Sequence, residues 1–163
     1  MIPDYKLYHG AVLAELVDGA KRTLSIRERV EEGRLGSYVL DDRVGLHIKH
    51  SAVRMPPWQF TFTPGNGREL LELRRTVSSV FVVLVCWLDG MVCLSLDELF
   101  EILGDEALPQ GWVRAERKKN EWYGVSGPRA VLSAKKPQGL AQLIGALEQP
   151  NQWAPFKWLR KFG

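Results

Sequence analysis

His47, Lys49 and His50 put two imidazoles and one ammonium group within four consecutive residues. If this segment is a strand, its alternation places His47 and Lys49 on the same face. Lysine supplies a positive point charge and neutral imidazole is a common metal ligand, so the pattern is typical of a phosphate or metal site. The polar face of an edge strand would look the same. Because the chain contains only three histidines, we expect no resident metal or other cofactor.

The segment from residue 49 to residue 58 combines basic and aromatic side chains with two consecutive prolines. Loops of this composition hold phosphates or stack bases, which suggests contact with a nucleic acid. The candidate contacts are Lys49, His50, Arg54 and Trp58. In the alternative interpretation, Trp58 packs into the core with Phe60 and Phe62, and the charged groups face water.

Charge is distributed unevenly along the chain. Residues 1–111 contain 12 Lys/Arg and 16 Asp/Glu, a net charge of −4, whereas residues 112–163 contain 10 and 3, a net charge of +7. An anionic partner would meet this C-terminal third, unless acidic residues of the same fold neutralise it. The basic candidates are Arg117, Lys118 and Lys119 in an expected turn, and Lys157, Arg160 and Lys161 further on.

Residues 153–162 contain five large apolar side chains and three positive charges, but no acidic residue. Such a segment is suited to bind a membrane surface, a nucleic acid or a partner protein. It is equally suited to fold back and close the core with its aromatic rings while its cations face water. We favour this docking onto its own domain.

Cys86 and Cys93 are the only cysteines, so there is no disulfide framework, and we expect a cytoplasmic protein with free thiols. The pair Asp89-Gly90 is typical of a two-residue hairpin turn. Such a turn would pair residue 86 with residue 93 and bring their Cα atoms to about 5.5 Å, or about 4.5 Å in a pair without hydrogen bonds. A zinc half-site or a redox pair is the alternative to two small buried thiols.

Apolar periodicity and capping signals predict four helices, which help to position these residues. They are residues 6–20, residues 68–77, Leu96–Leu103 and a segment with Pro137 in its first turn. The third has the clearest limits, because Ser95 and Glu98 form a capping box before it and Gly104 follows it.

Extended segments are predicted between these helices. They are residues 23–30, 37–40, 44–50, 58–63, 80–88, 91–94, 112–117, 122–125 and 130–134. Asp41-Asp42 is expected to form a tight turn, and the aromatic residues of 58–63 alternate as in a half-buried strand. The continuous apolar run Val80–Leu88 is typical of a central strand with both faces covered.

These elements predict one α/β (or α+β) domain over residues 1–163. A central mixed β-sheet is flanked by helices, followed by a small antiparallel C-terminal sheet and a C-terminal helix. Residues 6–94 would form the core, and residues 95–163 an extension with a basic hairpin, a helix and an aromatic tail. No apolar run reaches the ~18 residues of a membrane span, and the first residues do not have the pattern of a secretory signal.

The order helix, three or so strands, helix and central strand over residues 6–94 resembles the core of the restriction-endonuclease-like superfamily, the PD-(D/E)XK nucleases. In that family one strand carries an Asp, and the next carries Glu or Asp, any residue and Lys. The carboxylates bind Mg²⁺, and the Lys orients or activates the attacking water. His47-Ile48-Lys49 matches the second part, but His is a poor ligand for Mg²⁺ where the family has an acid. Ser37 stands where the upstream Asp is expected.

The resemblance therefore implies a scaffold without the family's chemistry. We expect a non-catalytic, nucleic-acid-associated module that uses the C-terminal third and residues 49–58 as contact surfaces. One alternative is a protein-interaction subunit or inhibitor of a larger bacterial or phage assembly. Another is a Mg²⁺-dependent nuclease whose catalytic residues are Glu15, Asp41 or Asp42, and Lys49. Other catalytic signatures, such as Gly-x-Ser-x-Gly or a phosphate-binding Gly-rich loop, do not occur in the sequence.

Overall fold

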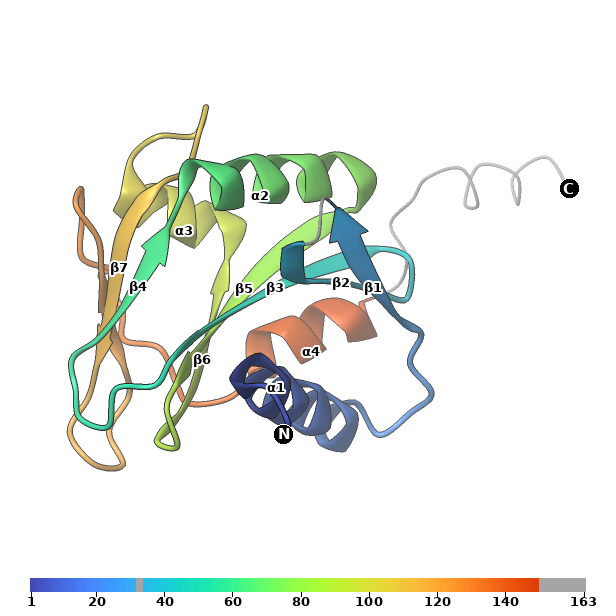
Figure 1. Cartoon of the computed structure of the whole chain (residues 1–163), viewed down its shortest axis with the longest axis horizontal. Coiled ribbons are helices and arrows are strands. Elements are labelled where there is room, and N and C mark those ends of the chain that lie inside the picture. Colours follow the sequence, from blue (N-terminus) through green and yellow to red (C-terminus); the bar gives the residue numbers. More distant parts are fainter. Residues whose placement is uncertain (32–33, 150–163) are drawn as a thin grey trace, which may run out of the picture.

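The computed structural model describes residues 1–31 and 34–149. They form a five-stranded mixed sheet covered on both faces, with a second, three-stranded sheet beside it (Figure 1). The large sheet has the order β1-β2-β3-β5-β6, in which β3 and β5 run parallel and the other neighbours are antiparallel. Its strands are β1 (Ile26–Glu31), β2 (Arg34–Leu40), β3 (Val44–Ser51), β5 (Ser79–Cys86) and β6 (Gly90–Ser95). The predicted α/β class with a central mixed sheet is confirmed.

Helices α1 (Asp4–Ala20) and α4 (Ala141–Glu148) cover one face of the large sheet (Figure 1). Helix α1 buries residues that recur every three or four positions, as an amphipathic helix must. They are His9, Val12, Leu16 and Ala20. The two helices share an apolar cluster with alternate residues of β3, among them Leu46 and Ile48. Every second side chain of β3 therefore packs on this face of the sheet.

Helices α2 (Pro64–Thr76) and α3 (Leu96–Leu103) lie on the opposite face, together with the second sheet (Figure 1). That sheet has the antiparallel order β4-β7-β8 and consists of β4 (Trp58–Phe62), β7 (Gly111–Glu116) and β8 (Gly124–Ser126). Both helices begin with a capping box, Thr63 with Asn66 in α2 and the predicted Ser95 with Glu98 in α3. Gly104 ends α3 in the left-handed conformation, as predicted.

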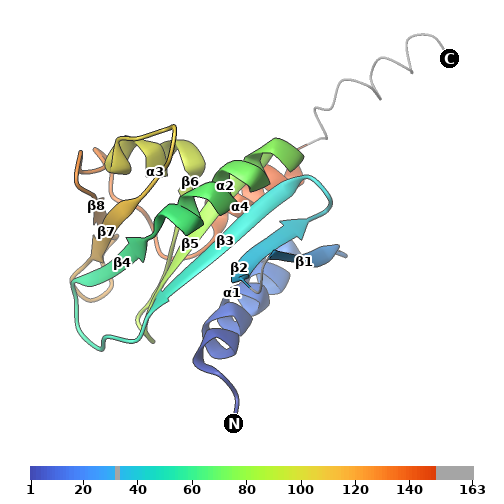
Figure 2. The same cartoon turned by 45° about the horizontal axis from the view of Figure 1, so that its top comes forward.

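Strand β3 positions the candidate functional residues His47 and Lys49. Alternation directs Leu46 and Ile48 toward α1 and α4, and it leaves His47 and Lys49 on the face that α2 covers. Strand β2 pairs with β3 only from Leu40 opposite Val44 to Ser37 opposite His47. Residues 48–51 therefore extend beyond the last pair, and Figure 2 shows β3 running on past β2.

The second sheet differs from the prediction in its third strand. Residues 130–134 do not form a strand, and Val131 makes only an isolated bridge with Ser126. The third strand is instead β4, whose Trp58, Phe60 and Phe62 are buried while the residues between them are exposed. The alternating aromatic pattern of this strand was predicted correctly, but sequence order does not specify that it pairs with β7.

The fourth helix begins later than predicted, at Ala141 and not at Pro137. Residues 136 and 139 instead form isolated bridges with two other parts of the chain before the helix starts. Lys136 bridges Tyr123, and Gly139, with φ +109°, bridges Val92. These long-range hydrogen bonds outweigh the local preference of proline for a first helical turn.

The turn between β5 and β6 also differs from the prediction. It contains residues 87–89, and Cys86 pairs with Gly90, whereas Cys93 pairs with Val83. Trp87 adopts φ +49°, which allows a three-residue loop, and the register differs by three positions from the predicted one, so that Cys86 faces Gly90 and not Cys93. Cys86 and Cys93 consequently lie on opposite faces of the sheet, in different apolar clusters. Both are free thiols, and burial raises the pKa of each to about 12.

None of the described helices combines the length and the apolar character needed to cross a membrane.

Candidate functional site

A cavity of about 180 Å³ lies at the open edge of β3, between the first turns of α1 and the start of α2. We call it the β3-edge pocket. It is lined by Tyr5, His9, His47, Ile48, Lys49, His50 and Asn66. All three histidines of the chain are among these residues, although one of them is distant in sequence from the other two. None of the lining residues is acidic, so the pocket favours an anion over a cation.

Lys49 supplies the positive charge of the pocket. Its Nζ donates a hydrogen bond to Oδ1 of Asn66 at 3.1 Å and lies 5.3 Å from the ring centre of Phe62. Burial lowers the pKa of this lysine, and the nearby carboxylate of Glu69 opposes that effect. Among the described residues, Lys49 forms no ion pair. Its ammonium is thus partly desolvated and can donate to a bound anion.

Asn66 is held in place by the local structure of α2. Its Oδ1 also accepts a hydrogen bond from the backbone N–H of Thr63 at 3.0 Å, and its own N–H donates to the Thr63 hydroxyl at 3.1 Å. This reciprocal capping box fixes the amide at the position where Lys49 reaches it. The start of α2 therefore serves both to begin the helix and to orient the lysine.

His47 belongs to a buried chain of hydrogen bonds that ends at Glu69. The hydroxyl of Ser37 donates to Oε1 of Glu69 at 2.6 Å, and Nδ1 of His47 lies 2.9 Å from the same hydroxyl oxygen. Because a serine hydroxyl has one proton, Nδ1 must carry the proton of the neutral imidazole and donate it to Ser37. Nε2 is then an acceptor. It is buried and has no hydrogen-bond partner among the described residues.

The other two histidines pack against tyrosines of α1 and β2. Nδ1 of His9 is 2.9 Å from the hydroxyl of Tyr38, and the His50 ring stacks on Tyr8 with centres 4.5 Å apart. Burial, followed by the proximity of His50, lowers the pKa of His9 to about 4. Burial, followed by Lys49 and His9, lowers the pKa of His47 to about 3. At neutral pH these two imidazoles are therefore uncharged hydrogen-bonding groups.

The expected carboxylates do not come together with Lys49. Asp41 lies at the β2–β3 turn, where it accepts hydrogen bonds from Arg22 at 2.7 Å and from the N–H of Ser25 at 3.0 Å. Burial alone would raise the pKa of Asp41, but these partners lower it. Strand β3 carries Lys49 about 16 Å away from this turn, at about 3.3 Å per residue.

The remaining two carboxylates of the expected set are also unsuited to a shared metal. Asp42 is exposed and lies 3.8 Å from Arg27. Glu15 is exposed on α1 and does not line the pocket. Within the described part of the chain, no group of three or more His, Cys, Asp or Glu side chains could hold a metal ion. Sequence reasoning missed Glu69, Asn66 and His9, because they lie on helices that are remote from β3 in the sequence.

Trp58 is a core residue and is not available to stack on bases. Its side chain is 1% exposed, its Nε1 donates to the carbonyl of Val53 at 2.8 Å, and its ring meets Tyr123 edge-on. The alternative in which Trp58, Phe60 and Phe62 pack into the core is therefore correct. Arg54 is exposed on the preceding connection, with its guanidinium 5.4 Å from the ring centre of Trp87.

Arg117 is engaged within the fold. Its Nε donates to Oδ2 of Asp89 at 2.7 Å, another nitrogen donates to the Asp89 carbonyl at 2.9 Å, and the guanidinium lies 4.4 Å from the ring centre of Tyr123. The Tyr123 hydroxyl donates to the same carboxylate oxygen at 2.5 Å. Lys136 similarly pairs with Glu98 at 2.9 Å. Acidic residues of the same fold thus neutralise part of the C-terminal basic excess.

Lys118 and Lys119 are exposed in the β7–β8 connection and are free to meet a partner. Lys157, Arg160 and Lys161, and the aromatic tail that contains them, lie outside the described residues.

Replacing Arg117 by Ala is expected to lower the free energy of unfolding by about 2–3 kcal/mol. The change leaves the Asp89 carboxylate without its cation and removes the interaction with the Tyr123 ring, and removing one member of a largely buried pair is costly. A double Lys118→Ala, Lys119→Ala variant should change stability by less than about 0.5 kcal/mol per site. Urea unfolding of both variants measures the difference, and equal stabilities would show that Arg117 is only a surface charge.

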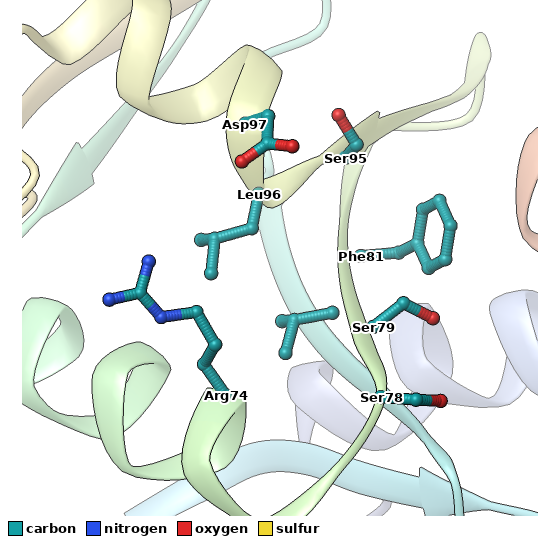
Figure 3. A pocket seen from close by; sticks show the side chains of 8 residues that line it. Arg74, Ser78, Ser79, Phe81, Ser95, Leu96 and Asp97 are labelled. Atoms are coloured by element: carbon teal, nitrogen blue, oxygen red, sulfur yellow. The ribbon is translucent and has the colours of Figure 1, made fainter. Parts of the chain in front are cut away.

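A second cavity, also of about 180 Å³, lies between the end of α2 and the start of α3 (Figure 3). Arg74 and Asp97 face it from opposite sides, together with Ser95. The capping box already uses the N–H groups of Ser95 and Glu98 at the start of α3, and Arg74 lies 5.2 Å from the ring centre of Phe100. Because Asp97 adds a negative charge here, this cavity is less suited to an anion than the β3-edge pocket.

Comparison with known proteins gives no match, since no family model, no curated protein and no solved structure is significantly similar to this chain.

Proposed function

We propose that this protein is a non-catalytic module that binds nucleic acid and takes a backbone phosphate into the β3-edge pocket. The observation that carries the proposal is the partly buried ammonium of Lys49, directed by Asn66 into a cavity with no acidic lining residue. Such a group forms strong, charge-assisted hydrogen bonds with phosphate oxygens. The neutral His47 imidazole adds no second charge to the pocket, and its Nε2, an acceptor, leaves Lys49 as the phosphate donor.

Aromatic side chains next to the pocket favour a nucleic acid over a free inorganic anion. Tyr5 lines the pocket, and Tyr8 stacks on His50 at its α1 side; both tyrosines are partly exposed. Proteins that bind single strands combine a cationic track with rings on which bases stack. Arg54 and Lys118 provide further exposed cations for the track. The same proposal places the protein in the cytoplasm, in keeping with its two free, buried thiols.

The proposal keeps the restriction-endonuclease-like scaffold but assigns it no nuclease chemistry. The order α1, β1 to β4, α2 and β5 is compatible with the order on which that resemblance rests, with β4 as an additional strand that belongs to the second sheet. Mg²⁺ would need two or more hard oxygen ligands near Lys49, and Asp41 is already bound to Arg22 at the far turn. Cleavage of DNA or RNA with Mg²⁺ that is lost in a Lys49→Gln variant would support the nuclease alternative instead.

Binding of a fluorescent single-stranded oligonucleotide should weaken about 10-fold or more in a Lys49→Gln variant, because one charge-assisted hydrogen bond disappears. Fluorescence anisotropy at several salt concentrations measures this. The slope of log affinity against log salt should also become shallower by about 0.7 for each phosphate that the variant no longer neutralises.

Lys135→Gln is the matched control, since Lys135 is exposed and does not line the pocket. It changes the net charge equally and should leave affinity nearly unchanged. If the two variants weaken binding by the same factor, only net charge matters and the pocket does not hold the phosphate. If the parent protein binds no nucleic acid at low salt, the proposed function itself is wrong.

A further inference from the structure

Three connections at one end of the molecule expose large apolar side chains. They are residues 52–57 between β3 and β4, residues 87–89 between β5 and β6, and residues 117–123 between β7 and β8. Figures 1 and 2 both show these connections at the same end of the fold. Four side chains, which we call the loop-tip surface, are exposed there: Val53 (57%), Met55 (71%), Leu88 (77%) and Trp122 (58%).

The three connections are fastened to one another. The backbone N–H of Trp87 donates to the carbonyl of Ser51 at 3.0 Å, and the Arg54 guanidinium lies 5.4 Å from the Trp87 ring centre. Arg117 then joins the third connection to Asp89 of the second at 2.7 Å. Because these contacts fix the loop backbones, the apolar tips are presented together and do not need to be ordered on binding.

The charge among these tips is positive. The three connections contain four cations and two acids, and one acid, Asp89, is already paired with Arg117. Arg54, Lys118 and Lys119 are exposed in the same connections as three of the apolar tips. Aliphatic tips of this kind gain nothing from a phosphate backbone, so nucleic acid accounts for the cations but not for Met55 or Leu88.

We propose that the loop-tip surface binds an anionic lipid bilayer, with its apolar tips in the interfacial layer and its cations on the headgroups. Binding at a bilayer surface combines burial of apolar area with attraction of Lys and Arg to anionic lipids, and both are offered here. The indole of Trp122 is of the type enriched at membrane–water interfaces. Separate protruding side chains can insert into the fluid interfacial layer of a bilayer, whereas a protein partner would need a surface that is complementary in shape to all of them.

Co-sedimentation of the full chain with phospholipid vesicles tests the proposal. Vesicles of phosphatidylcholine with about 30% phosphatidylserine should bind the protein, and pure phosphatidylcholine should bind it at least about 10-fold less, because the headgroup attraction is absent. A double Met55→Ser, Leu88→Ser variant should reduce binding to the anionic vesicles about 10-fold or more. Both positions are exposed, so the variant should fold normally, which circular dichroism verifies.

The matched control is Leu7→Ser with Val17→Ser, which removes two equally apolar side chains that are exposed on α1 (55% each). This control and Lys49→Gln should bind the anionic vesicles like the parent protein. Failure of the parent to bind them overturns the proposal. Undiminished binding of the Met55→Ser, Leu88→Ser variant also overturns it, because membrane contact then belongs to another part of the chain. Self-association of the parent that this variant abolishes, without vesicle binding, would identify a contact between copies instead.

Discussion

Lowering the pH from 6.5 to 4.5 is expected to reduce the free energy of unfolding by about 4 kcal/mol, through His47 and His9 alone. Both are buried in the folded chain, where their pKa values fall to about 3 and about 4. In the unfolded chain each imidazole titrates near its ordinary pKa of about 6.5. Since a domain is typically stabilised by about 5–15 kcal/mol, the loss should be conspicuous.

The sign follows from the protons bound by each state. Between the folded and unfolded pKa values, the unfolded chain binds more protons than the folded chain, so acid favours unfolding. The contribution of the two neutral histidines to the free energy of unfolding is fully present above about pH 6.5. It is lost as the pH falls toward their folded-state pKa values of about 3 and about 4. Each group contributes up to about 1.4 kcal/mol per pH unit in that window. The polar and titratable groups that act on His47 are Ser37, Glu69, Lys49 and His9.

Urea unfolding at a series of pH values measures this dependence. A His47→Gln variant should lose about half of the slope, because His9 alone then remains, whereas His50→Gln should keep most of it. If His47→Gln does not fold, NMR titration of the imidazole carbons in the parent protein gives the same information. Constant stability between pH 6.5 and pH 4.5, or an imidazole of His47 that titrates near pH 6.5, would refute the buried neutral state.

Replacing Trp58 by Ala is expected to lower the free energy of unfolding by about 3–5 kcal/mol. The side chain is almost completely buried between the second sheet and the large sheet, and its Nε1–H bond to Val53 also fixes the β3–β4 connection. Truncation therefore leaves a cavity and releases a hydrogen bond. Thermal or urea unfolding provides the measurement.

Trp122→Ala is the matched control, because Trp122 is 58% exposed. It should change stability by less than about 0.5 kcal/mol. Trp58→Phe should fall between the two, since it keeps an aromatic ring in the core but loses part of the buried volume and the hydrogen bond. A Trp58→Ala variant that is as stable as the parent but binds oligonucleotides more weakly would instead favour the base-stacking role that the sequence suggested.

The elements with strong local signals were predictable from the sequence. The capping box at Ser95 and Glu98, the buried run of β5 and the alternating aromatic residues of β4 each carry their signal within a few residues. The β5–β6 turn was not predicted correctly, because both a two-residue and a three-residue loop suit a sequence with Asp89-Gly90. The left-handed residue Trp87 belongs to the three-residue loop, and every partner in the ladder lies three positions away from the one predicted.

The candidate site was predictable only in part. Alternation along β3 correctly placed His47 and Lys49 together, because that relation is local. The residues that complete the pocket, His9 and Asn66, come from α1 and α2, and only the packing of helices on opposite faces of the sheet brings them to β3. The role of Arg117 was not predictable from its neighbours. Its basic neighbours suggested a binding turn, but its partner in the fold is Asp89, 28 positions away in the sequence.

The most direct test of the central claim is to locate a bound phosphodiester by NMR. The backbone and side-chain signals of the ¹⁵N-labelled full chain are recorded while a short single-stranded oligonucleotide is added. The account predicts that the largest shifts occur at Lys49, His50 and the side-chain amide of Asn66, and that Lys49→Gln abolishes them. Shifts confined to Lys118 and Lys119 or to the C-terminal basic residues, with the pocket signals unchanged, would contradict it.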